Sequence, residues 1–394
     1  MAKQNNLLIA ILTFGVFGIL NTEMGVIGIL PSLAEFYGVS VSQAGLLVGL
    51  FALAIAIAGP TMPLLFSGID RKKVLLLVLG IFVLGNIVTI FTTNYTVVLI
   101  IRFISGLFHP VYVSLAFTIA AASVKKEEAP KAVANVFIGV SAGMVVGVPI
   151  VSFIANTASI QMALAFFAVV NALVFMATLI FVPSMPVQEK LSYGAQLSVL
   201  KKSITWLSIV GVIFLNASVF GVYSYFAEYL NSVTNMSLNT ITIMLFLFGL
   251  TNIIGNIIAG KVLTQNAIKT VVTLPFALGV VYIIFFLFGE FTIPMAIVTL
   301  FWGVLAGIGA NINQYWVMSS APEAPTFANG LFLTSANIGV TVGSAVGGLF
   351  ISQLGTQYVL LVGFLSIKLS LVFILLRNYK DSSIQNKLSE HQVS

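Results

Sequence analysis

The chain has 394 residues, of which 59% are hydrophobic and only 7% charged, and its formal net charge is +6. A soluble domain carries roughly 25% charged residues, so this composition excludes a water-soluble fold and predicts a polytopic membrane protein. With no cysteine and two histidines far apart, the chain lacks the residues for a disulfide framework or for a Cys/His metal cluster. Its basic residues lie in short clusters between apolar segments, a pattern typical of membrane orientation signals, and this argues against a nucleic-acid partner.

Apolar segments near the roughly 20 residues that a bilayer requires recur from one end of the chain to the other. Their ranges are 8–31, 43–66, 74–93, 96–122, 131–155, 161–182, 204–230, 238–260, 270–289, 292–316, 327–352 and 357–377. The first segment is too long for the core of a signal peptide and has no cleavage-like end, so we expect it to be a span. The sequence therefore predicts an all-α membrane protein with twelve transmembrane helices surrounded by lipid.

Lys and Arg residues outside these segments lie only at the termini or after even-numbered spans, as in the cluster at 71–73. Because positively charged loops stay on the cytoplasmic side, we expect both termini to be cytoplasmic in a multi-pass protein of the cell membrane. The polar stretch 183–203 is the predicted cytoplasmic loop between an N-terminal half, 1–182, and a C-terminal half, 204–377. Residues 378–394 are expected to form a solvated, partly disordered cytoplasmic tail.

The two predicted halves also match each other in sequence. Glycines recur at one constant offset, and the pairs are Gly59 and Gly255, Gly143 and Gly339, and Gly147 and Gly343. Two parallel-related halves of six spans are typical of transporters that bind their substrate between the halves near mid-membrane.

Three charged residues lie well inside the predicted spans, namely Glu23, Arg102 and Lys368, and Glu228 lies near the outer end of span 7. An ionisable side chain in hydrocarbon costs several kcal/mol unless it is neutralised, paired or wetted. The helical rise places Glu23 and Arg102 at similar heights, so a contact is feasible if their spans are neighbours. Such a pair could hold a proton whose position depends on what else binds, or it could be permanently structural. We favour the transport role because ionisable groups inside a membrane mark pathways.

Span 4 carries Arg102, Gly106 and His109 on one helical face, and Pro110 is expected to kink the helix just after it. His109 is either a proton relay that works near neutral pH or a hydrogen-bonded packing residue. Lys368 either extends its amine toward the interface or bonds backbone carbonyls.

Span 5 has a glycine every fourth residue, at Gly139, Gly143 and Gly147, followed by Pro149. Such spacing gives a flat face for close helix packing. We expect this face to control how the two halves rock without touching the transported molecule, and simple close packing is the alternative.

Other polar side chains in the spans could hydrogen-bond a ligand or one another. The candidates for the substrate cavity are Asn21, Asn216, Tyr223, Tyr225, Asn252, Asn256 and Asn311. The sequence has no nucleophile elbow, paired-carboxylate motif or Walker A loop. We therefore expect no enzyme activity, no cofactor and no metal.

Several of these stretches resemble the twelve-span drug:proton antiporter branch of the major facilitator superfamily. Asn21-Thr22-Glu23-Met24, followed by Pro31, resembles the first-span signature of that branch, and the stretch from Arg102 to His109 is similar to its fourth-span motif. The stretch from Gly139 to Pro149 is similar to its fifth-span antiporter motif. Over essentially the whole chain the sequence looks most like the sugar-efflux or arabinose-efflux permeases and related multidrug exporters.

The loop after the second span departs from the family pattern. The family has an Asp-Arg pair where Gly68 and Ile69 stand here, and Asp70 is shifted to precede Arg71, Lys72 and Lys73. Asp70 could pair with basic groups from this position or cap a helix end, so the departure bears on the family's inner-gate charge relay and leaves the fold unaffected.

The resemblance implies a proton-coupled exporter of small organic molecules such as sugars or drugs, working by alternating access. Because two six-helix halves form a complete transport unit, we expect a monomer. In that reading Glu23 carries the proton, Arg102 tunes it, and His109 is a further proton-coupling candidate. A proton-independent sugar or nucleoside facilitator or importer is the main alternative. A membrane receptor or scaffold that does not transport is a more distant one.

Overall fold

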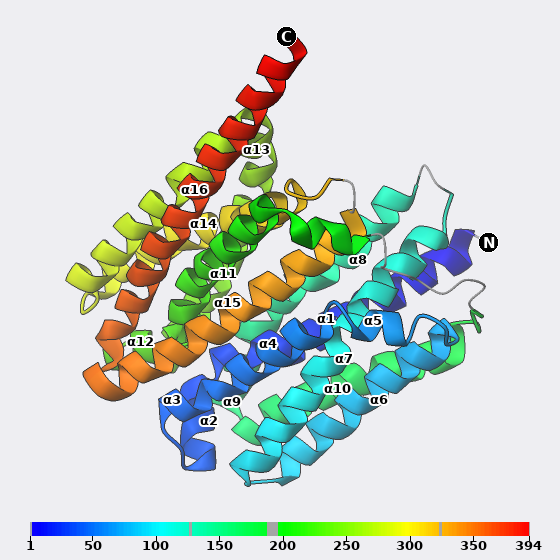
Figure 1. Cartoon of the computed structure of the whole chain (residues 1–394). Coiled ribbons are helices and arrows are strands. Elements are labelled where there is room, and N and C mark those ends of the chain that lie inside the picture. Colours follow the sequence, from blue (N-terminus) through cyan, green and yellow to red (C-terminus); the bar gives the residue numbers. More distant parts are fainter. Residues whose placement is uncertain (1, 126–127, 187–195, 323–324, 394) are drawn as a thin grey trace.

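A computed structural model of the chain describes residues 2–125, 128–186, 196–322 and 325–393 (Figure 1). Residues 187–195 of the predicted central loop lie outside this described part. The helices are α1 (Ala2–Gly28), α2 (Leu30–Tyr37), α3 (Val41–Ala44), α4 (Leu46–Ala58), α5 (Met62–Leu65), α6 (Arg71–Phe91), α7 (Tyr95–Ala122), α8 (Ala129–Ala142), a π-helix η1 (Gly143–Gly147), α9 (Val148–Thr157), α10 (Ile160–Phe181), a 3-10 helix η2 (Gln196–Lys201), α11 (Ser203–Tyr223), α12 (Phe226–Ser232), α13 (Leu238–Phe288), α14 (Thr292–Met318), α15 (Pro325–Leu354), a 3-10 helix η3 (Thr356–Tyr358) and α16 (Val359–Val393). The described residues contain no strand.

Eleven helical segments within the described ranges are long and apolar enough to cross a bilayer. One of them, α13, has 51 residues, which at the α-helical rise would extend to more than twice the thickness of a ~30 Å hydrocarbon core. It leaves helical geometry at Asn266 (φ −158°, ψ 88°), and the chain turns there. The predicted spans 238–260 and 270–289 are thus two arms joined by a tight turn, and the twelve-span, all-α prediction is confirmed.

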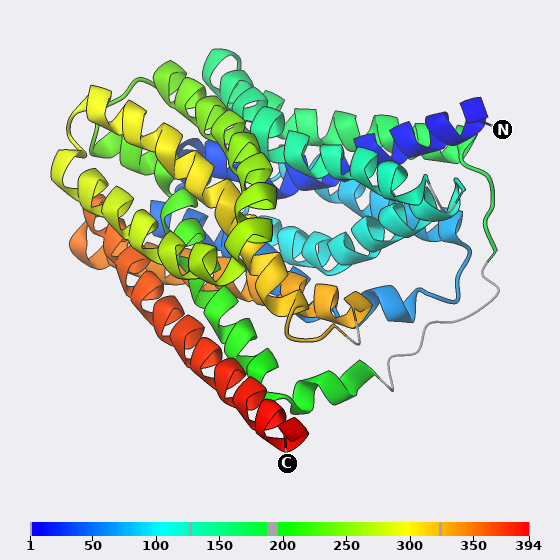
Figure 2. The same ribbon diagram turned by 90° about the horizontal axis from the view of Figure 1, so that it is seen from above.

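Two groups of helices make up the molecule (Figures 1 and 2). Helices α1–α10 form the N-terminal group and α11–α16 the C-terminal group. The groups meet at the end that carries α2, α3 and α12, called the outer end below, and they diverge toward the opposite, inner end. Both chain termini lie at the inner end.

Hydrogen bonds join the two groups along the outer part of the bundle. The Ser152 and Thr242 hydroxyls are 2.8 Å apart, and the Asn156 amide donates to the Leu238 carbonyl at 3.1 Å. Farther from the outer end, Thr341 donates to the carbonyl of Gly49 at 3.2 Å. These contacts hold the outer ends of the helices together.

Local sequence explains where several helices end. Pro31 lies at the start of α2, and the chain leaves helical geometry at Ile29 (φ −123°), because proline has no N–H to continue the helical hydrogen bonds and its ring clashes with the carbonyl four residues before it. At the outer end, Ser40 and Gln43 form a reciprocal capping box that starts α3. The predicted tail, 378–394, is helical as far as Val393, where α16 ends.

Candidate functional site

Glu23 of α1 faces His109 of α7 inside the N-terminal group. The Nε2 atom of His109 lies 3.0 Å from Oε2 of Glu23, within ion-pair distance although the two atoms are not aligned for a hydrogen bond. Both residues are buried, with Glu23 8% and His109 9% exposed. The His109 ring also meets Phe51 edge-on, with centroids 6.0 Å apart. Because the imidazole is charged only when protonated, the pair is an ion pair only when His109 carries a proton and Glu23 does not.

Arg102 of α7 makes a different set of contacts from the one predicted. Its Nε donates to the Leu47 carbonyl at 2.9 Å, Nη1 to the Thr22 carbonyl at 2.7 Å, and Nη2 to the backbone carbonyl of Glu23 at 3.1 Å. The guanidinium also lies over the Phe51 ring, 4.6 Å from its centroid. Within the described residues, no carboxylate oxygen is in ion-pair contact with Arg102. The expected contact between the Arg102 and Glu23 side chains is therefore replaced by bonds from Arg102 to main-chain oxygens of α1 and α4.

Helix direction accounts for this choice of partners. Side chains lean toward the N-terminus of their own helix, and α1 begins at the inner end whereas α7 begins at the outer end. The Glu23 carboxylate therefore leans inward, toward His109, while Arg102 leans outward and away from that carboxylate. His109 lies two turns farther inward on the same face of α7, where the carboxylate reaches it.

Polar residues that the sequence analysis did not single out support this part of α1. The amide of Asn171 in α10 donates to the Thr22 hydroxyl at 3.0 Å and to the Phe167 carbonyl at 2.8 Å. Asn86 of α6 approaches the same hydroxyl at 3.4 Å. All three side chains are buried, and hydrogen bonding is what makes their burial tolerable. A signal existed in the sequence, since Asn86 and Asn171 are amides within otherwise apolar spans.

The glycine face of span 5 packs on α1. Gly139 lies against the main chain of Thr13 and Phe17, Gly143 against Leu20, and Gly147 against the side chain of Asn21. This is the close packing that the spacing predicts. The substrate-cavity candidate Asn21 is fully buried by it.

The same stretch also reaches the other helix group. It adopts the π-helix η1 at Gly143–Gly147, and Pro149 then lies in the first turn of α9. Val145 of η1 contacts Gly249 of α13. The antiporter-like motif therefore touches α1 on one side and the C-terminal group on the other.

The amide candidates of the C-terminal group form two hydrogen-bonded sets. Asn313 donates to the Asn216 side chain at 2.9 Å, and Asn216 donates to the Ala336 carbonyl at 2.7 Å. In the second set, Asn311 donates to Asn256 at 2.6 Å and Asn256 to Asn252 at 3.2 Å. The members of the second set are half-buried. Of the two alternatives that the sequence left open, these amides bond one another in this conformation.

Tyr223 and Tyr225 are core residues in this structure, at 2% and 1% exposed. The Tyr223 ring stacks on Phe248, with centroids 4.7 Å apart, and the Tyr225 hydroxyl donates to the Ser344 carbonyl at 2.7 Å. Neither offers a surface to a ligand in this conformation, so their assignment as cavity residues is not supported.

The loop after the second span is tied to the inner end of span 6. Asp70 caps α6 by accepting from the Lys73 N–H at 3.1 Å, and the Ser184 hydroxyl donates to its other oxygen at 2.7 Å. The Arg71 N–H donates to the Met185 carbonyl at 3.1 Å, and Lys72 Nζ donates to the Leu179 carbonyl at 2.9 Å. The loop thus anchors two helix ends within one group.

These bonds predict an acid-dependent contribution from Asp70. The Ser184 hydroxyl, followed by backbone N–H groups, holds the pKa of the Asp70 carboxyl below its ordinary value. The carboxylate therefore stabilises the fold above its unfolded-state pKa near 3.9, and this contribution is lost as the pH falls through the lower folded-state pKa. We expect Asp70→Ala to cost about 1 kcal/mol through loss of the cap, whereas Asp70→Asn keeps an acceptor and costs less.

Thermal unfolding in detergent, followed from neutral pH to about pH 3, measures both effects. Wild type should lose stability relative to Asp70→Asn at the acid end. Parallel curves for the two proteins would contradict a titrating cap.

The remaining ionisable residues of the spans lie elsewhere. Lys368 is exposed on the outside of α16, away from Glu23, and Glu228 is half-buried at the outer end in α12. Among the described residues no group of three or more His, Cys, Asp or Glu side chains is placed to hold a metal ion.

Comparison with known proteins agrees with this architecture. Residues 12–334 match the family model of the Major Facilitator Superfamily. The chain is 27% identical over 364 residues to the inner membrane transport protein YdhP of Escherichia coli, covering 92% of this chain and 94% of that protein. It is 24% identical over 387 residues to a probable sugar efflux transporter of Pasteurella multocida, covering 97% and 95%.

Solved structures show the same fold. The crystal structure of the nucleoside transporter NupG is similar with a TM-score of 0.74 and 16% identity, over 95% of this chain and 98% of that one. A bacterial homologue of the human lysosomal transporter Spinster, in an inward-facing and occupied conformation, has a TM-score of 0.73 and 15% identity, over 94% and 96%. With twelve spans in two groups and a family match across most of its length, this chain belongs to the Major Facilitator Superfamily.

Proposed function

We propose that this chain, a membrane transporter of small molecules, is a proton-coupled exporter that exchanges protons for small organic molecules such as sugars or drugs. The observation that carries the proposal is the buried pair of Glu23 and His109, 3.0 Å apart. A buried acid beside a buried base holds a proton whose position responds to nearby charge and hydration.

Glu23 is the proton carrier in this proposal and His109 is its partner. With a proton on the pair the site holds a charged imidazole beside the carboxylate, or two neutral groups, and loss of the proton leaves a bare carboxylate in an apolar interior. That bare charge is costly, so deprotonation should favour whichever arrangement of the helix groups gives Glu23 water or a partner. Arg102 acts on this equilibrium through its charge and through its bonds to the α1 main chain.

Alternating access would move the two helix groups about their contacts. They meet at the outer end and diverge at the inner end (Figure 1), and positive loops at the inner end favour a cytoplasmic location for it. This conformation then corresponds to an inward-facing state. A structural change near Glu23 would be transmitted to the C-terminal group through η1. Its Gly147 contacts Asn21 of α1, and its Val145 contacts Gly249 of α13.

The remaining assignments belong to the same proposal. We place both termini in the cytoplasm of a cell that carries the protein in its cell membrane, and we divide the chain into halves at 1–182 and 204–377. A monomer is proposed, since two six-helix groups form one complete transport unit. We also propose that the half-buried amides Asn252, Asn256 and Asn311 bind a polar substrate, and that their hydrogen bonds to one another are then replaced by hydrogen bonds to the substrate.

The test is transport by purified protein in liposomes, with sugars, nucleosides and neutral or cationic drugs as candidate substrates. An antiporter accumulates its substrate when a pH gradient is imposed, and this accumulation disappears when an ionophore collapses the gradient. Counterflow that is unchanged by collapse of the gradient would overturn the proton-coupled proposal in favour of a facilitator.

A further inference from the structure

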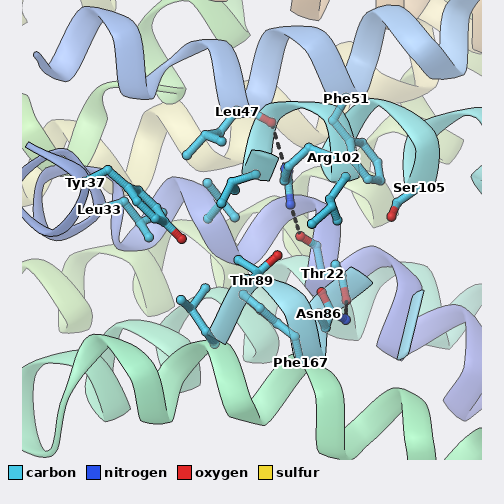
Figure 3. A pocket seen from close by; sticks show the side chains of 14 residues that line it. Thr22, Leu33, Tyr37, Leu47, Phe51, Asn86, Thr89, Arg102, Ser105 and Phe167 are labelled. Carbon is cyan, nitrogen blue, oxygen red and sulfur yellow. Dashed lines mark hydrogen bonds between the residues drawn. The ribbon is translucent and has the colours of Figure 1, made fainter. Parts of the chain in front are cut away.

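A small cavity lies inside the N-terminal group, apart from the contacts between the two groups. It is lined by side chains of six helices of this one group (Figure 3). Its volume is about 20 Å³, and a water molecule requires roughly 10–15 Å³ measured the same way. The lining is therefore wide enough for water and too narrow for an organic substrate.

The cavity occupies the outer part of the group. Leu33 and Tyr37 of α2 line it at the outer end, and Phe51 and Ser105 line it deeper in the bundle. Ser105 precedes His109 by one helical turn of α7. The cavity thus extends from near the outer surface toward the layer that holds Glu23 and His109.

Its walls carry polar groups suited to water. Tyr37 is 9% exposed, and its hydroxyl has no hydrogen-bond partner and points into the cavity (Figure 3). Thr22, Asn86 and Thr89 lie on the facing walls. A buried hydroxyl without a protein partner is commonly satisfied by water.

Arg102 lies on the wall of this cavity, between Tyr37 in its outer part and Ser105 deeper in the bundle (Figure 3). Its three donated bonds go to the carbonyls of Leu47, Thr22 and Glu23, and among the described residues no carboxylate oxygen lies within ion-pair distance of the guanidinium. A fixed positive charge in a narrow watery passage repels protons, as it does in water-selective pores.

We propose that this cavity is a water inlet from the outer side, and that Arg102 is the electrostatic barrier that keeps protons in this water from reaching Glu23 and His109. The proposal rests on the proposed function in one respect, since it takes Glu23 to be the proton carrier. While the helix groups are closed at the outer end, the carrier must exchange protons with the inner side alone. A hydrated passage without a barrier would dissipate the gradient with no substrate moved.

The first test measures proton leak in liposomes without any substrate. An acid-outside gradient with a clamped membrane potential is imposed, and internal pH is followed by a trapped dye. Removing one charge a few ångströms from the proton path should raise the leak of Arg102→Met by about tenfold or more over wild type. Arg102→Lys keeps the positive charge but loses the three hydrogen bonds of the guanidinium. Its proton leak should stay within about twofold of the wild-type leak, because a barrier of this kind depends on charge.

The leak should pass through Glu23. Adding Glu23→Gln to Arg102→Met is expected to return the leak to the wild-type rate. Equal leak in Arg102→Met and Arg102→Lys would overturn the barrier assignment. If both leaks were high, the hydrogen bonds of Arg102 and not its charge would be the barrier, and if both were low, Arg102 would not be a barrier at all.

The second test measures access to the cavity and needs no transport. Because the chain has no cysteine, Thr89→Cys introduces a single thiol on the cavity wall. Silver ions, small enough to follow water, are applied from the outer side, and the protein is then unfolded and treated with maleimide. Silver should block maleimide labelling at least several-fold more in Thr89→Cys than in Thr178→Cys, whose position is fully buried in α10 and does not line the cavity.

These outcomes separate the inlet from the antiport mechanism. Equal protection of the two thiols would overturn the inlet even if substrate-driven proton exchange were found. Selective protection at position 89 with a leak in Arg102→Met would support the inlet and its barrier even if no tested substrate moved protons.

Discussion

Glu23→Gln is expected to abolish accumulation driven by a pH gradient while leaving substrate binding in place. Glutamine keeps the shape of the side chain but cannot exchange a proton, so no proton can accompany each transport cycle. One proton moving down a gradient of about 1.7 pH units releases ~2.3 kcal/mol, which corresponds to about a 50-fold concentration ratio. Accumulation in liposomes should therefore fall from a ratio of this order to about one.

Glu35→Gln is the matched control, because Glu35 is an exposed carboxylate in α2. It should accumulate substrate like wild type. If Glu23→Gln accumulated substrate as the control does, Glu23 would not be the proton carrier, and His109 or Glu228 would have to take that role.

Gly139→Val is expected to destabilise the fold more than the same substitution at Gly143 or Gly147, the other two glycines of the span 5 face. A β-carbon at Gly139 would clash with the Thr13 carbonyl oxygen, and it would lie 3.1 Å from the Phe17 nitrogen. Both are main-chain atoms of α1, which cannot rotate aside as a side chain can. Overpacking of this kind costs about 1–3 kcal/mol, and the thermal unfolding midpoint in detergent measures it.

Gly279→Val provides the comparison, because no atom lies within 4 Å of a β-carbon built at Gly279. It should unfold near the wild-type temperature. Equal midpoints for the two variants would show that α8 can move off α1 without loss, and the role given to the span 5 face would then fail.

Much of the fold is predictable because the bilayer constrains the sequence so strongly. A span requires about 20 apolar residues, so the twelve segments and the loops between them stand out without any tertiary information. The glycine spacing at Gly139, Gly143 and Gly147 likewise predicts a close packing face, and the structure shows α1 as the helix that it meets. Glu23 is conspicuous for the same reason, as a charge where hydrocarbon is expected.

The partners of buried polar residues are less accessible to sequence reasoning. Similar heights made Glu23 and Arg102 plausible partners, but antiparallel helix directions send the two side chains opposite ways, and His109 meets the carboxylate instead. The hydrogen bonds from Asn86 and Asn171 to the Thr22 hydroxyl could not be predicted, because they depend on which helices are neighbours. The turn at Asn266 and the π-helix at Gly143–Gly147 are set by local geometry that periodicity does not encode.

The most direct test of the central claim is proton release from purified wild-type protein in weakly buffered detergent when a substrate is added. Sugars, nucleosides and drugs are tried in turn, with Glu23→Gln beside wild type. Proton-coupled export predicts that one class of compound releases protons from wild type and none from Glu23→Gln, although both proteins bind the compound. Binding to wild type without any release would contradict antiport, and release that persists in Glu23→Gln would contradict the assignment of the proton to Glu23.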